Sequence, residues 1–97
     1  MAEQDRKQDW AVDRTSAGWA LTNTSGRTAR NVYVEFQGTF DGQPWREGVT
    51  PAGGLPAVGV VPPGRTVRMS VLAAETTHTV HVRWTSGLRT RLWSQRV

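Results

Sequence analysis

The sequence contains no cysteine, which excludes a disulfide-bonded scaffold and a zinc site with thiolate ligands. It also lacks any apolar run close to the ~20 residues that a membrane-spanning helix needs, and its first residues are charged rather than apolar. We therefore expect a cytoplasmic protein with no membrane segment, in which packing alone stabilises the fold.

The chain is long enough for one domain and too short for the large α/β enzyme folds, at 97 residues and 10.7 kDa. Its mean hydropathy of −0.49 is polar, but five tryptophans and many valines are too much apolar mass for a disordered chain. We expect residues 9–97 to form a single domain and residues 1–8 to form a disordered N-terminal tail.

Apolar residues recur at every second position, which is the period of a half-buried β-strand. The pattern predicts an all-β fold, an antiparallel β-sandwich of about seven strands. Five strands are indicated around 19–22, 32–36, 67–71, 80–84 and 88–93, with weaker candidates at 10–13 and 57–61. The predicted core consists of Trp19, Leu21, Val32, Val34, Phe36, Val67, Met69, Val71, Val80, Val82, Trp84 and Leu88.

Residues 42–64 depart from this pattern, because they hold all five prolines and six of the ten glycines. We expect one short edge strand near Val58–Val61 and a loop of roughly fifteen residues around Trp45. Further along, Thr85-Ser86-Gly87 predicts a three-residue hairpin loop in which the glycine supplies a positive φ.

The chain resembles small bacterial immunoglobulin-like sandwiches of the CARDB and FxLYD types. The resemblance spans about residues 15–93 and includes Trp19-Ala20-Leu21-Thr22-Asn23, residues 29–34, Pro63-Gly64 before a strand, and the Val-x-Val-x-Trp of residues 80–84. It implies an immunoglobulin-like sandwich that acts in adhesion, spacing or partner binding without catalysis. Stand-alone sandwiches of this kind also resemble phage virion accessory or decoration proteins, so a location in a virion stays open.

No combination of residues indicates catalysis. His78 and His81 are three apart on a predicted strand and would point to opposite faces, so they are poorly placed to share a metal ion. A Gly-x-Ser-x-Gly motif and a phosphate-binding glycine loop before a helix are both missing. We therefore expect no enzyme, no catalytic residue, no metal and no cofactor.

Positive charge is concentrated in the second half, where residues 49–97 carry six arginines and a single acidic residue, Glu75. Alternation directs four of them, Arg68, Arg83, Arg89 and Arg91, outward, and it directs Trp93 outward beside them. If Trp84 faces Leu88 across the hairpin, Arg83 lies opposite Arg89 and His81 lies opposite Arg91. This basic face would suit a polyanion such as nucleic acid. The alternative is a solvated face whose arginine stems cover apolar surface.

Trp45 and Trp10 have no place in the alternating core. A tryptophan exposed on a Gly/Pro-rich loop suits a protein interface, although Trp45 could instead fold back over an open end of the sandwich. The leading hypothesis is an interaction module that binds a protein partner or a second copy through the 42–64 loop and an exposed sheet edge. Its predicted contacts are Trp45, Arg46 and Trp93.

Overall fold

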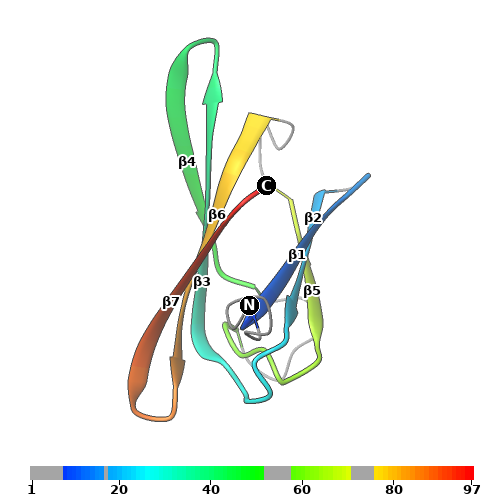
Figure 1. Cartoon of the computed structure of the whole chain (residues 1–97), viewed down its shortest axis with the longest axis vertical. Helices are drawn as coiled ribbons and strands as arrows, with labels where there is room; N and C mark the ends of the chain where they lie inside the picture. Colours follow the sequence, from blue (N-terminus) through cyan, green and yellow to red (C-terminus); the bar gives the residue numbers. More distant parts are fainter. Residues whose placement is uncertain (1–7, 17, 52–57, 71–75) are drawn as a thin grey trace, which may run out of the picture.

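The computed structural model describes residues 8–16, 18–51, 58–70 and 76–97. They form an all-β fold of seven antiparallel strands in two sheets (Figure 1). The strands are β1 Trp10–Thr15, β2 Gly18–Asn23, β3 Arg30–Phe40, β4 Gln43–Val49, β5 Thr66–Met69, β6 Thr77–Ser86 and β7 Arg89–Arg96. Within the described residues, no helix is long and apolar enough to span a bilayer.

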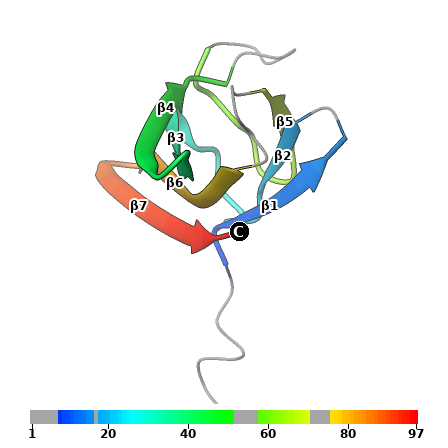
Figure 2. The ribbon, with the colours of Figure 1, turned by 90° about the horizontal axis from the view of Figure 1, so that it is seen from above.

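The two sheets form the two layers of the molecule, as the view from above shows (Figure 2). The smaller sheet has the strand order β1-β2-β5, and the larger has the order β4-β3-β6-β7. The inner face of each sheet is the one turned toward the other sheet. Strands β3 and β6 are the longest and form the centre of the larger sheet, whose edges are β4 and β7.

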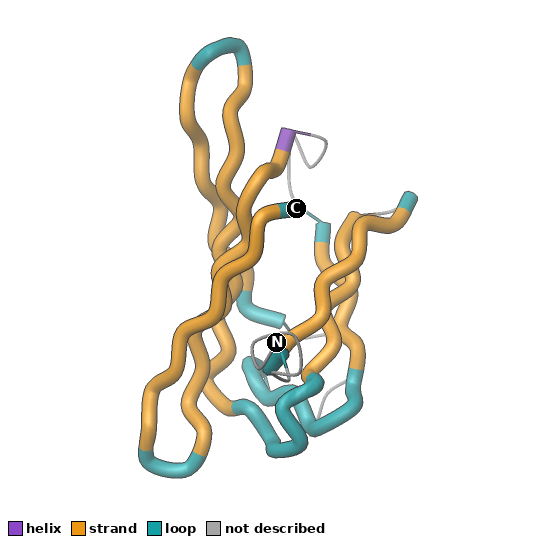
Figure 3. Tube along the Cα trace, viewed as in Figure 1, coloured by secondary structure: helices purple, strands orange, loops and turns teal. Residues whose placement is uncertain are grey.

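Two tight hairpins extend the larger sheet at its opposite ends (Figure 3). Asp41 and Gly42 both have positive φ, 56° and 78°, and connect the paired residues Phe40 and Gln43. Two positive φ angles define the type I′ turn, for which Asp-Gly is a preferred sequence. At the other end, Gly87 (φ 62°) opens a two-residue turn between Ser86 and Arg89, as a type II′ turn requires.

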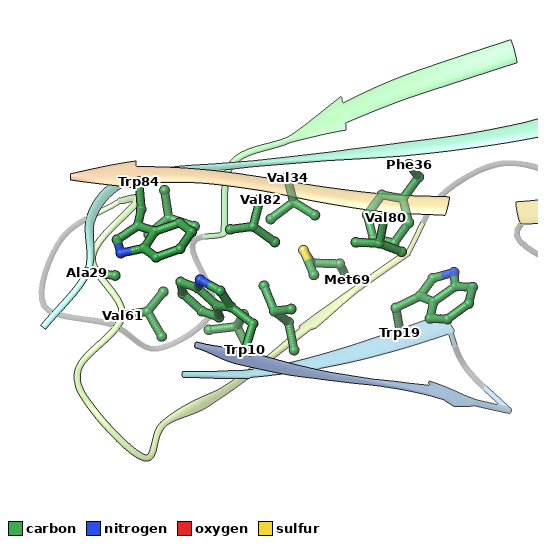
Figure 4. Close-up of a cluster of buried hydrophobic side chains, with 13 residues drawn as sticks. Trp10, Trp19, Ala29, Val34, Phe36, Val61, Met69, Val80, Val82 and Trp84 are labelled. Carbon is green, nitrogen blue, oxygen red and sulfur yellow. The ribbon is translucent and has the colours of Figure 1, made fainter. Parts of the chain in front are cut away.

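Three tryptophans and a set of valines fill the space between the sheets (Figure 4). The rings of Trp10 and Trp84 meet edge to face at 5.5 Å between centroids, and Trp19 packs on Phe36 at 5.8 Å. Ten of the twelve predicted core residues are buried, because strict alternation sends them all to one side of their strands. The prediction for Val71 falls outside the described residues.

Two predictions about the core are wrong. Leu88 is fully exposed, with a relative accessibility of 104%, because it occupies the second position of the β6–β7 turn. Trp10, which had no place in the predicted core, is only 1% exposed, because β1 begins at this residue and its indole closes the core against Trp84.

The loop predicted around Trp45 is also wrong, since residues 43–49 form β4. The expected edge strand near Val58–Val61 reduces to one isolated bridge between Ala29 and Val61. The type I′ turn at residues 41–42 is what returns the chain directly along β3. Residues 1–7 of the predicted tail and residues 52–57 of the predicted loop lie outside the part that the structure describes.

Candidate functional site

Trp45 lies on edge strand β4 and faces inward, directly opposite Gly38 of β3. Its indole is half-buried against the core, and its Nε1 donates a hydrogen bond to Thr76 Oγ1 at 2.8 Å. A Cβ on Gly38 would lie 2.6 Å from Cζ2 of the Trp45 ring, so the glycine leaves the space that the indole fills. The position matches the alternative in which Trp45 folds back on the sandwich.

Arg46 points to the opposite face of β4. Its Nη1 lies 3.7 Å from Oε2 of Glu35 on the outer face of the sheet, and its side chain is largely exposed. Trp45 and Arg46 therefore do not form one contact surface, because neighbouring residues of a strand point to opposite faces.

Trp93 also faces inward rather than outward. It pairs with Val82 on the inner side of the larger sheet and is half-buried against the core. Its Nε1 donates a hydrogen bond to Gln8 Oε1 at 2.9 Å, which links β7 to the chain just before β1. The outward orientation predicted for this residue is wrong.

The predicted register of the last hairpin is wrong by three residues, because the turn consists of Gly87 and Leu88 instead of residues 85–87. Trp84 pairs with Arg91, and Arg83 pairs with Leu92. An odd shift exchanges the two faces of a strand. Arg91 therefore shares the inner face with Trp84, and Arg89 lies on that same side opposite Ser86.

The four predicted polyanion-binding arginines consequently do not share a face. Arg68 lies on the outer face of the smaller sheet, where it pairs with Ala20, and Arg83 lies on the outer face of the larger sheet. Arg89 and Arg91 lie on the inner side of β7. These four arginines therefore lie on three different surfaces.

The outer face of the larger sheet instead brings together Tyr33, Arg83 and Leu92, which lie side by side on β3, β6 and β7. The guanidinium of Arg83 lies 5.2 Å from the centre of the Tyr33 ring, within cation–π range. Leu92 is 76% exposed beside them. The three side chains border a hollow of about 310 Å³ that also contains Glu35, His81 and Ser94.

Strand β7 presents an open backbone edge beside this hollow. Val97 N donates a hydrogen bond to His78 O at 3.0 Å, which places the odd-numbered residues of β7 in the positions bonded to β6. Bonded and non-bonded pairs alternate along an antiparallel ladder. The backbone N–H and C=O groups of Thr90, Leu92 and Ser94 therefore face away from β6, and no described strand pairs with them.

The other sheet edges are less suited to accept a strand. On β4, the backbone N of Pro44 faces away from β3, toward the open side of this edge. Because proline has no N–H, the edge lacks a hydrogen-bond donor at this position. Strands β1 and β5 have six and four residues, whereas β7 has eight and contains neither proline nor glycine.

Among the described residues, no three His, Cys, Asp or Glu side chains gather in a group that could hold a metal ion. Comparisons with protein-family models, curated proteins and solved structures find no match to this chain. Any proposal about function therefore rests on the geometry of the chain itself.

Proposed function

We propose that this protein is a non-enzymatic interaction module that binds an extended segment of another protein along the open edge of β7. The observation that carries the proposal is an eight-residue edge strand without proline, next to an exposed row of Tyr33, Arg83 and Leu92. Strand addition gains affinity from main-chain hydrogen bonds and specificity from alternate side chains. Tyrosine and arginine are also enriched among the residues that dominate binding energy in protein interfaces.

The charges of β7 favour an acidic partner. The strand carries Arg89, Arg91 and Arg96 and no acidic residue. A strand added beside it would place alternate side chains on the inner side, next to Arg89 and Arg91, and the others on the outer side, next to Leu92. A segment of alternating acidic and apolar residues has the complementary pattern.

A second copy of the chain is a poorer partner at this edge. Pairing β7 with its own copy would bring six arginines to one seam with no carboxylate on either strand, and like charges on paired strands are destabilising. Inward-pointing and edge charges are also a common protection against self-pairing. The same arginines thus disfavour self-association and favour an acidic strand.

The order of the strands supports the immunoglobulin-like interpretation of the fold. Sheets of orders β1-β2-β5 and β4-β3-β6-β7, with sequential strands crossing between the layers, agree with an immunoglobulin-type sandwich. One fold can carry many unrelated functions, so the proposal of a binding function rests on the features of β7 and not on the fold.

The test compares two variants at one position. Ser94→Pro removes the N–H that faces the open edge of β7, and the hydrogen bonds to β6 stay because this N–H does not take part in them. Ser94→Ala keeps the N–H and removes only the hydroxyl that bonds to His81. The probe is a fluorescein-labelled peptide of alternating glutamate and valine, blocked at both ends, and fluorescence anisotropy reports its binding. We expect Ser94→Ala to bind like the wild type and Ser94→Pro to bind at least about ten-fold more weakly.

Two further probes separate the alternatives. A peptide of alternating lysine and valine should not bind, since it meets the arginines of β7 with like charge. A labelled DNA duplex tests the polyanion alternative. Binding of the duplex that is equal in Ser94→Pro and Ser94→Ala, with no binding of the acidic peptide to either, would replace strand addition by polyanion binding.

A further inference from the structure

A polar, open cavity lies at the end of the sandwich that contains the β6–β7 hairpin and the turn after β2, and the side chains of Arg27 and Arg91 that line it are exposed. Its volume is about 290 Å³. The residues that line it come from four separate parts of the chain: Asp9, Ser25, Arg27, Trp84, Ser86 and Arg91. None of these residues contributes to the outer-face row beside the β7 edge.

The turn after β2 is fixed on one side of this cavity by the buried side chain of Asn23. Its Nδ2 donates to Arg27 O at 2.7 Å and to Val61 O at 2.8 Å, and its Oδ1 accepts from Ser25 N at 2.9 Å. Thr24 N donates to Asp9 O at 2.9 Å, which fixes Asp9 to the same turn. The backbone that carries Asp9, Ser25 and Arg27 is therefore held in place without any ligand.

The opposite side is set by the register of the hairpin. Arg91 pairs with Trp84 on the inner face, so its side chain lies beside the indole. Trp84 is 1% exposed and lines the cavity, and Figure 4 shows its nitrogen turned outward from the end of the core cluster. Its N–H has no acceptor among the described residues. The nitrogen is open to the cavity, so it can donate a hydrogen bond to a group bound there.

The charged groups of the cavity are equally unpaired. Arg27 and Arg91 form no ion pair with another described residue, and neither does Asp9. Two guanidinium groups, one carboxylate, the Trp84 N–H and the Ser86 hydroxyl give an excess of donors and a charge of +1. A single negative charge with two acceptor oxygens would neutralise the site, whereas a dianion would leave it with a net charge of −1.

We propose that this cavity binds a carboxylate, which accepts hydrogen bonds from the Trp84 indole and from the guanidinium groups of Arg27 and Arg91. Planar bidentate recognition of a carboxylate is the chemistry for which guanidinium is best suited. The carboxylate can belong to a small free acid or to an acidic side chain of a protein partner. The inference does not depend on strand addition, because Arg27 and Trp84 lie outside β7.

The experiment follows the Trp84 indole N–H resonance by NMR during titration with sodium acetate, with sodium chloride at equal ionic strength as the reference. We expect acetate to shift this resonance and chloride to leave it in place. Arg27→Gln should weaken the acetate response about ten-fold. Arg68→Gln, which changes an exposed arginine on the other sheet, should leave the response unchanged.

The blocked glutamate–valine peptide forms the second arm. A shift of the Trp84 N–H with the peptide but not with acetate, lost in Arg27→Gln, assigns the carboxylate to a protein partner. The proposal is overturned if neither probe shifts the resonance, if chloride shifts it equally, or if Arg27→Gln leaves the shift unchanged. Ser94→Pro should leave the acetate response intact, so failure of strand addition and failure of this site are distinguishable.

Discussion

Replacing Asn23 with alanine will lower the free energy of unfolding by about 3 kcal/mol. The side chain is fully buried and makes four hydrogen bonds, to Arg27 O, Val61 O, Ser25 N and Ser25 Oγ. Each such bond contributes about 0.5–1.5 kcal/mol net. The four bonds together give about 2–6 kcal/mol, and Val61 O keeps the bond from Ala29 N, so the expected loss lies in the lower half of that range.

The assay is urea unfolding followed by tryptophan fluorescence, since Trp10 and Trp84 lose their buried environment on unfolding. For a domain of this size, a loss of about 3 kcal/mol lowers the melting temperature by about 12–24 °C. The matched control is Asn31→Gly, because Asn31 is exposed, has one long hydrogen bond of 3.5 Å and sits at a positive φ that glycine accepts. A loss below about 1 kcal/mol in Asn23→Ala, or an equal loss in both variants, would show that these four bonds do not stabilise the fold.

Three more variants test the packing. Gly38→Ala should destabilise the fold by about 1–3 kcal/mol in the same urea assay, because its Cβ would overlap the Thr76 carbonyl oxygen and the Trp45 ring, and a neutral result would contradict the close packing of both groups on this glycine. Trp10→Ala should cost about 3–5 kcal/mol, visible as a lower thermal midpoint by circular dichroism. Leu88→Ser should change stability by less than about 0.5 kcal/mol, and a larger loss would place this residue back in the core.

The sequence predicts the core well because burial in a sandwich is a local property. A strand with one buried face repeats every two residues, so the spacing of Val80, Val82 and Trp84 indicates their orientation without knowledge of the partner strands. Trp10 was not predicted to be buried because it is followed by two further apolar residues, Ala11 and Val12, so this strand shows no clear alternation of apolar and polar residues. Its place depends on the pairing of β1 with β2, which is a non-local fact.

The proposed binding edge could not be predicted because the face on which its residues lie depends on turn geometry. Gly87 supplies a positive φ in a two-residue or a three-residue loop, and the two choices send Leu92 and Arg91 to opposite faces. The Gly-x preference of the type II′ turn was the available signal. Likewise, Asp41-Gly42 indicates a type I′ hairpin followed by a strand. The high proline and glycine content of the next residues favoured a loop instead, although the structure has β4 there.

The most direct test of strand addition is hydrogen exchange of the β7 amides, measured by NMR with and without the blocked glutamate–valine peptide. We expect the peptide to slow exchange at Leu92 and Ser94, whose amides face the open edge, and to leave Arg91 and Trp93, whose amides already face β6, nearly unchanged. Equal slowing at all four amides, or slowing confined to β4, would contradict strand addition.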